Sequence, residues 1–148
     1  MNRRISLTIL PLLAIVFTVG CGGDPKVTGK VTFPDGTPLK KGQVMFQKDG
    51  FVGSGNIQKD GTYSAGKQKD GDGLPPGKYQ VFLTGTSDYD NSAAEQNPGT
   101  FGGGPKFAMP MPINLIANKF TAPNTSGLTM EVTSKGPNKF DIVVDPPQ

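Results

Sequence analysis

The sequence contains no histidine, no tryptophan and only one cysteine. Histidine is the commonest general base and the usual partner of a catalytic serine or cysteine, so its absence excludes the familiar hydrolase triads. The absence of histidine and the single cysteine also exclude zinc sites, because these depend on histidine and cysteine ligands. These absences predict a protein that is not an enzyme and that uses no cofactor.

The chain also lacks an apolar run of membrane-spanning length. Its most apolar segment, from Ile5 to Gly20, has 16 residues, whereas a spanning helix needs about 20. The segment follows the basic residues Arg3 and Arg4, and this order is typical of a cleaved signal peptide. A signal peptide over residues 1–20 is therefore favoured over an uncleaved membrane anchor.

The apolar segment ends in the string Phe17-Thr18-Val19-Gly20-Cys21-Gly22-Gly23, which resembles the lipobox of bacterial lipoproteins. The resemblance implies cleavage between Gly20 and Cys21 and attachment of acyl chains, such as palmitate, to the cysteine. Thr18 departs from the pattern, since leucine is usual there. The alternative is a secreted protein with a free thiol, which is uncommon in an oxidising compartment.

The resemblance also implies a location in the cell envelope, with the protein held at a membrane by its lipid. Gly22, rather than aspartate, follows the cysteine. By resemblance this favours the outer membrane, facing the periplasm, over the inner membrane.

Removal of residues 1–20 takes away both arginines, which leaves 13 of the 15 basic residues against 12 acidic ones, a net charge of +1. Arginine supplies the planar fork that suits phosphate groups. A nearly neutral chain without arginine argues against nucleic acid as a partner. The remaining residues are enough for one domain. We assign residues 21–25 to a lipidated tether, 26–145 to that domain and 146–148 to a tail.

Glycine and proline are abundant, but their placement favours an ordered fold. Asp-Gly pairs begin at Asp35, Asp49, Asp60 and Asp70, and this dipeptide adopts the positive φ angles that tight hairpins need. Apolar residues alternate with period two between the turns, which predicts half-buried strands. The pattern predicts an all-β protein, a single antiparallel Greek-key β-sandwich of about seven strands. Its predicted core consists of Val27, Gly29, Val31, Phe33, Val44, Phe46, Ile57, Tyr63, Tyr79, Val81, Leu83, Leu128, Met130, Val132, Phe140, Ile142 and Val144.

Residues 85–112 show no such alternation and are rich in glycine, asparagine, serine and proline. Loops of this length are functional or disordered. Disorder, or packing over the end of the sandwich, is favoured over a binding loop. If the loop does bind a ligand, Tyr89, Phe101 and Phe107 are its candidate contact residues.

Several motifs occur in an order that resembles a carboxypeptidase regulatory-like, or transthyretin-like, β-sandwich domain. They are Val27-Thr28-Gly29-Lys30-Val31, Asp35-Gly36-Thr37-Pro38-Leu39, Gly42-Gln43-Val44-Met45-Phe46 and Leu74-Pro75-Pro76-Gly77-Lys78-Tyr79-Gln80-Val81. The C-terminal part, especially Lys119-Phe120 and Thr125-Ser126-Gly127-Leu128-Thr129-Met130-Glu131-Val132, is similar to the ending of small bacterial envelope lipoproteins that carry this domain. The resemblance implies a structural or accessory module without catalytic residues.

Two pairs of carboxylates remain as candidate calcium ligands, Asp70 with Asp72 and Asp88 with Asp90. Calcium takes six to eight oxygen ligands, and neither spacing matches an established calcium loop. Exposed turn formation is the favoured interpretation of all four residues.

Three functions follow from these patterns. The favoured one is a membrane-anchored, non-catalytic module that contacts another envelope component, either a protein or a glycan. The alternative is a carbohydrate-binding-like module that uses the 85–112 loop. An enzyme that depends on paired carboxylates has the least support.

Overall fold

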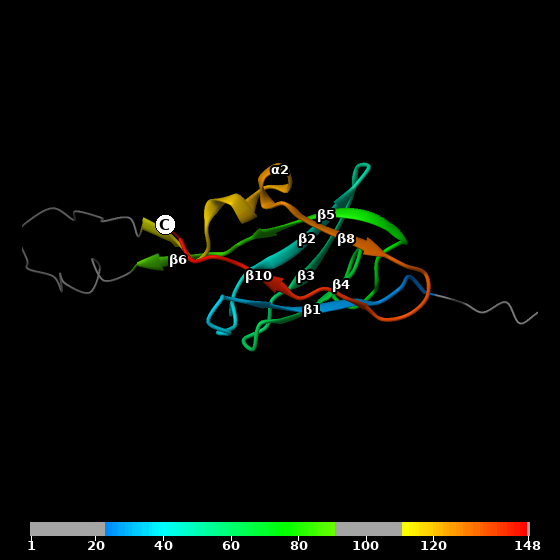
Figure 1. Ribbon diagram of the computed structural model, residues 1–148, viewed down its shortest axis with the longest axis horizontal. Helices are drawn as coiled ribbons and strands as arrows, with labels where there is room; N and C mark the ends of the chain where they lie inside the picture. Colours follow the sequence, from blue (N-terminus) through cyan, green and yellow to red (C-terminus); the bar gives the residue numbers. More distant parts are fainter. Residues whose placement is uncertain (1–22, 91–110, 148) are drawn as a thin grey trace, which may run out of the picture.

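The computed structural model describes residues 23–90 and 111–147, and these form an all-β protein with ten strands (Figure 1). The prediction of an all-β fold is confirmed. About seven strands were expected, and the additional ones are short segments that lie in or overlap the predicted 85–112 loop or follow residue 137. Helical structure in the described residues is confined to two single turns, η1 (Asn118–Thr121) and α2 (Pro123–Ser126).

The strands form two four-stranded sheets and a separate ribbon. The first sheet contains β1 (Val27–Thr32), β4 (Thr62–Ala65), β9 (Asn138–Lys139) and β10 (Ile142–Val143). The second has the order β3 (Phe51–Asn56), β2 (Gln43–Lys48), β5 (Gly77–Thr84) and β8 (Leu128–Val132). Pairing is antiparallel throughout the second sheet, whereas β9 and β10 lie parallel to β1 in the first.

The Asp-Gly pairs that begin at Asp35, Asp49, Asp60 and Asp70 form turns, as predicted. Their glycines have φ angles between 80° and 85°, which a residue with a side chain rarely adopts. Asp49 and Gly50 make the two-residue hairpin between β2 and β3, and both have positive φ, as a type I′ turn requires. The local sequence therefore determines where β2 ends and where β3 begins.

Two of these turns share a hydrogen-bonded arrangement. Asp35 Oδ1 accepts hydrogen bonds from the Oγ1 and N of Thr37, at 2.7 and 2.9 Å. Asp60 Oδ1 accepts the equivalent bonds from Thr62, at 2.6 and 3.0 Å. The threonine hydroxyl, followed by the threonine N–H, lowers the pKa of each carboxyl below its ordinary value. Both turns are therefore stabilised by the charged form of the aspartate.

This arrangement predicts how stability depends on pH. Because the folded-state pKa values are lowered, the two aspartates stabilise the fold above the unfolded-state pKa of about 3.9, and that contribution is lost as the pH falls through the folded values. We expect the double variant Asp35→Asn, Asp60→Asn to lose less melting temperature than the wild type between pH 7 and pH 3. Circular dichroism melts at each pH would measure this difference. Identical acid-dependent losses in the two proteins would contradict it.

One apolar core lies between the two sheets. The Phe46 ring, from the second sheet, lies with its centroid 6.1 Å from that of Tyr63 in the first sheet and 6.3 Å from that of Tyr79. Most predicted core residues are buried, while Phe33, Leu128 and Phe140 are partly buried against the core. Further buried residues came from segments without alternation, namely Leu39, Leu74, Ile116 and Phe120.

Gly29 of β1 is a place of close backbone approach. Its hydrogen faces the carbonyl of Phe140, and a Cβ at this position would overlap that carbonyl group. The same Phe140 oxygen accepts a 2.6 Å hydrogen bond from the Tyr63 hydroxyl, and Phe140 N–H donates to the Thr28 oxygen at 2.8 Å. Burial, and to a lesser degree the charge of Asp141, raises the pKa of Tyr63, so its hydroxyl stays protonated and keeps donating.

The outer edge of β3 is bridged by the segment that follows β4. Ser54 and Gly66 exchange two backbone hydrogen bonds, each 2.9 Å long. Further along the same edge, Asn56 N–H donates to the Asp70 carboxylate at 3.2 Å. Part of the backbone that this edge strand would otherwise expose, at Ser54 and the N–H of Asn56, is therefore occupied within the chain.

The predicted loop at 85–112 begins and ends in strands, which corrects the expectation that it has no regular structure. Strands β6 (Ser87–Asp90) and β7 (Met111–Asn114) pair in an antiparallel ribbon, with Tyr89 opposite Pro112. Four-residue strands, one with an internal proline, leave too little alternation to be recognised. The ribbon lies at one end of the molecule (Figure 1). Residues 91–110 lie outside the described part of the chain.

Candidate functional site

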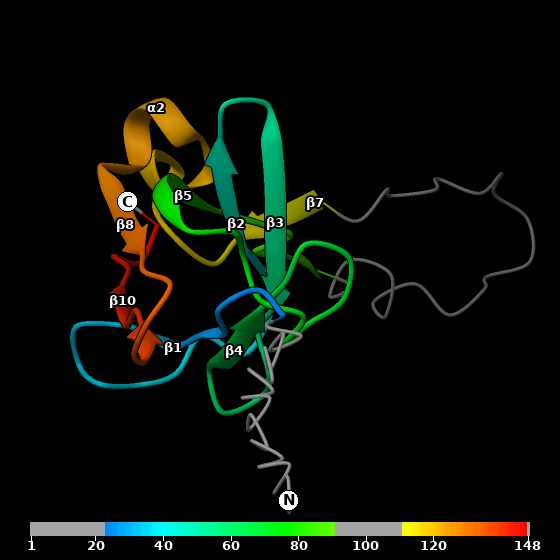
Figure 2. The same ribbon diagram turned by 90° about the vertical axis from the view of Figure 1, so that its right-hand side faces the viewer.

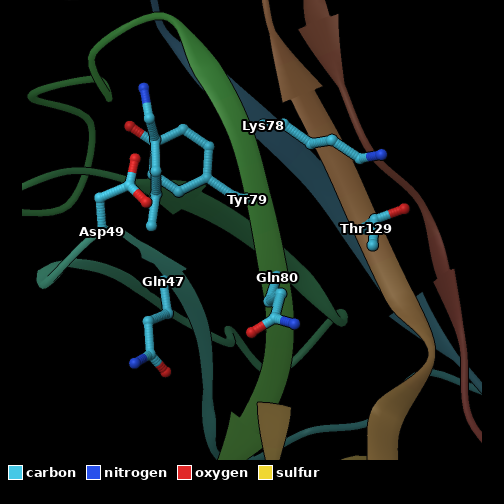
Figure 3. A pocket seen from close by; sticks show the side chains of 7 residues that line it. Gln47, Asp49, Lys78, Tyr79, Gln80 and Thr129 are labelled. Atoms are coloured by element: carbon cyan, nitrogen blue, oxygen red, sulfur yellow. The ribbon is translucent and has the colours of Figure 1, made fainter. Parts of the chain in front are cut away.

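The outer face of the second sheet carries a shallow depression of about 580 Å³ (Figure 3). Three adjacent strands, β2, β5 and β8, and the turn after β2 contribute to it. The residues that line it are Gln47, Lys48, Asp49, Lys78, Tyr79, Gln80 and Thr129. We take this depression as the candidate binding site.

A row of uncharged polar side chains crosses the depression. The register places Gln47 opposite Gln80, and Gln80 opposite Thr129. Because side chains alternate between the faces of a strand, these residues point outward while neighbours such as Phe46 and Val81 point into the core. Two carboxamides and a hydroxyl therefore offer both hydrogen-bond donors and acceptors along one line.

Lys48 and Tyr79 form one side of the depression. Lys48 Nζ lies 5.9 Å from the centroid of the Tyr79 ring and donates a 3.2 Å hydrogen bond to the Pro76 carbonyl. The Tyr79 hydroxyl donates to the Pro75 carbonyl at 2.7 Å, and the residue is only 1% exposed. Burial, with a smaller contribution from the charge of Asp24, raises the pKa of Tyr79. Tyr79 therefore presents no open ring face to a ligand.

This arrangement suits hydrogen bonding to an extended polar chain. Lys78 is opposite Glu131 at the margin, so charges of both signs border the central polar row. The depression is open, with exposed side chains at Gln80 and Thr129. A ligand lying across the strands would meet the row of amide and hydroxyl groups without entering an enclosed cavity.

The residues predicted for lipid attachment and signal cleavage, Cys21 and Gly20, lie outside the described residues. Phe101 and Phe107 of the predicted binding loop do so as well. Tyr89 is placed on β6, where it is 60% exposed. Strand β6 follows the end of β5, whereas the depression lies near the start of β5 and the turn after β2, so the structure does not bring the predicted loop contact and the polar row together.

The carboxylates considered for calcium have partners within the chain. Asp70 accepts bonds from the N–H and the Nδ2 of Asn56, at 3.2 and 2.9 Å. Asp72 accepts a 3.2 Å bond from Lys69 N–H. Both therefore stabilise the segment between β4 and β5.

The other pair lies on the ribbon. Asp88 accepts a 2.9 Å hydrogen bond from Tyr89 N–H and lies 3.5 Å from Lys41 Nζ, and these contacts, the N–H first, lower its pKa. Asp90 is the last residue of β6. Residues 23–90 and 111–147 hold no cluster of three or more His, Cys, Asp or Glu side chains suited to a metal ion.

No sequence motif singles out Gln47, Gln80 or Thr129 as binding residues. Alternation predicts that each points away from the core, but only the register shows that they are neighbours. No helix within the described part of the chain has the length and apolarity needed to cross a membrane.

Comparisons with known proteins give one structural likeness. No model of a known protein family matches the chain, and no curated protein matches it. A DUF3823 family protein from Bacteroides ovatus has a similar structure, with 19% sequence identity and a TM-score of 0.43. The likeness covers 83% of this chain and 45% of that protein, so this chain spans less than half of its neighbour's length.

Proposed function

We propose that this protein is a lipoprotein of a bacterial cell envelope, with a non-catalytic interaction module held at the membrane through Cys21. The observation that carries the proposal is the order of features at the N-terminus. A basic pair and a 16-residue apolar segment lead directly to a small residue and the single cysteine. Strand β1 begins at Val27, so the folded domain follows the cysteine after a short spacer.

The module is, in this proposal, a Greek-key sandwich of the carboxypeptidase regulatory-like type. The order of strands supports this, because the chain moves repeatedly between the sheets. It passes from β1 in the first sheet to β2 and β3 in the second, and returns to β4 before crossing again to β5. Domains of that type serve as accessory modules, which agrees with a role in binding rather than catalysis.

The polar depression supplies the contact surface. Its row of Gln47, Gln80 and Thr129 favours a partner recognised by hydrogen bonding, such as an extended segment of another envelope protein. A saccharide is favoured less, because sugar binding normally uses an open aromatic face and Tyr79 is buried. Carbohydrate binding through the 85–112 segment, with Tyr89 as its exposed aromatic, stays a prediction.

Replacing Cys21 with serine tests the proposal. Each methylene of a buried acyl chain contributes about 0.8 kcal/mol, so two or three chains hold a protein at a membrane for practical purposes permanently. Cells grown with radiolabelled palmitate should yield labelled wild-type protein in the outer-membrane fraction of a density gradient. We expect Cys21→Ser to lose the label completely.

Thr18→Leu is the matched control, because it restores the usual lipobox residue and keeps the acceptor cysteine. This variant should incorporate palmitate at least as well as the wild type. Wild-type protein that takes up no label and remains in the soluble fraction would refute the proposal.

A further inference from the structure

Asp24 and Pro25, near the start of the described chain, are bonded to the segment between β4 and β5. The Asp24 carboxylate forms a 2.9 Å ion pair with Lys67 Nζ. The Pro25 carbonyl accepts a 3.0 Å hydrogen bond from Leu74 N–H. Gly73 lies so close to the Asp24 carbonyl that a side chain at position 73 would overlap it. The chain is therefore part of the fold from Asp24 onward.

This attachment limits how far Cys21 is from the domain. Consecutive Cα atoms are 3.8 Å apart, so the three steps from Cys21 to Asp24 span at most about 11 Å. A lipid on Cys21 would therefore hold one particular end of the molecule within about one nanometre of the bilayer. A long, flexible tether would have left the orientation free.

The register identifies the parts of the chain at that end. Val27, the first residue of β1, is opposite Ala65 at the end of β4 and Asn138 at the start of β9. Gly77, the first residue of β5, is opposite Val132 at the end of β8. The connections 66–76 and 133–137 therefore lie beside residues 24–26. Figure 2 views the molecule from this end, and the ribbon of β6 and β7 lies at the opposite end in Figure 1.

The side chains exposed at this end are polar and include several lysines. Lys26, Lys69 and Lys135 are exposed, and the ion pairs among the described residues involve other lysines. Asp24 is paired with Lys67, while the Asp70 and Asp72 carboxylates accept hydrogen bonds from the Asn56 side chain and from the backbone N–H of Lys69, not from its ammonium group.

Apolar insertion into the bilayer is not expected from this end. The large apolar side chains that are most exposed in the described residues are Val52, Tyr89, Ile113 and Val143. None of them lies in residues 24–26, 66–76 or 133–137. Lysines without acidic partners suit the phosphate groups at a bilayer surface.

We propose that residues 24–26, 66–72 and 133–137 form a membrane-facing surface that rests on the phosphate headgroups of an anionic bilayer. The ribbon of β6 and β7 then points away from the membrane. This orientation rests on the proposed lipidation of Cys21. It adds that the short tether and the lysines, rather than the lipid alone, determine which end of the domain the bilayer meets.

Single-cysteine reporters test the orientation, because a lipidated Cys21 leaves an introduced thiol as the only site for a dye. Gln68→Cys places a donor dye on the membrane-facing surface, and Lys59→Cys places one in the turn between β3 and β4 at the other end. The lipidated proteins are reconstituted in phosphatidylethanolamine–phosphatidylglycerol vesicles that carry an acceptor dye on a lipid headgroup. The six-residue strand β1 runs between the two ends, so the two positions differ by about 20 Å in their distance from the bilayer. We therefore expect energy transfer from position 68 to be at least about twice that from position 59.

The outcomes distinguish this proposal from the one on which it rests. Equal transfer from the two positions, in protein whose mass shows the acyl chains, would overturn the orientation alone. Protein that lacks acyl chains and fails to float with the vesicles would overturn both proposals.

Two further variants distinguish the effect of the short tether on the orientation from the effect of the lysines. A twelve-residue Gly-Ser linker inserted between Gly23 and Asp24 should lower transfer from position 68. Lys26→Gln, Lys69→Gln and Lys135→Gln, combined in the linker variant, should lower it again and make it insensitive to added salt. Transfer that is unchanged by both modifications would overturn the roles given to the tether and the lysines.

Discussion

Gly29→Ala is expected to destabilise the protein by about 3 kcal/mol or more, which is at the upper end for a single substitution. The new Cβ would overlap the backbone carbonyl of Phe140, which cannot swing away as the end of a flexible side chain would. Moving that carbonyl would also break its hydrogen bond with the Tyr63 hydroxyl and loosen the bond from Phe140 N–H to Thr28. Urea unfolding followed by circular dichroism measures the loss.

Gly23→Ala is the control for this substitution. No atom lies within 4 Å of the position that its Cβ would take, so we expect a change within about 0.5 kcal/mol. A Gly29→Ala variant with the unfolding midpoint of the wild type would show that the contact between β1 and residue 140 is not as close as described.

Phe46→Ala should have the second large effect, a loss of about 3–5 kcal/mol. The Phe46 ring contacts Tyr63 of the first sheet and Tyr79 of its own sheet, so its removal leaves a cavity where the two sheets meet. For a domain of about 100 residues this loss corresponds to a fall in melting temperature of roughly 15 °C or more. A differential scanning calorimetry experiment gives that shift directly.

Phe46→Leu keeps most of the apolar volume and should cost less than about 1.5 kcal/mol. Comparing Phe46→Leu with Phe46→Ala separates the stability that comes from filling the core volume from the stability that comes from the aromatic contacts. If Phe46→Ala melted within a few degrees of Phe46→Leu, Phe46 would not join the sheets in the way proposed here.

The sequence predicts the framework of this fold because that framework depends on local chemistry. Asp-Gly pairs place the turns through the φ angles that glycine allows, and alternation assigns residues such as Val44 and Val81 to the core. Ile116 and Phe120 escape prediction because they reach the core from an irregular segment. The same limit applies to the ribbon, whose strands are too short to show a period.

The candidate site was harder to predict than the fold, since it depends on pairing between distant strands. Gln47, Gln80 and Thr129 are ordinary outward-facing polar residues until β2, β5 and β8 are placed in register. The proposed membrane-facing surface likewise depends on pairing between distant strands. Lys69 and Lys135 belong to different connections, and they come to the same end only because β4 and β9 both pair with β1.

The bridge between Ser54 and Gly66 has a consequence for molecules that share a membrane. Lipid anchoring confines proteins to a plane and presents them to one another in similar orientations, so collisions between equivalent edges become frequent. An open edge strand would let neighbours join their sheets into aggregates. On β3, the backbone groups of Ser54 bond to Gly66 and the N–H of Asn56 bonds to Asp70. In the proposed lipid-anchored state, these bonds would disfavour pairing between copies along the β3 edge.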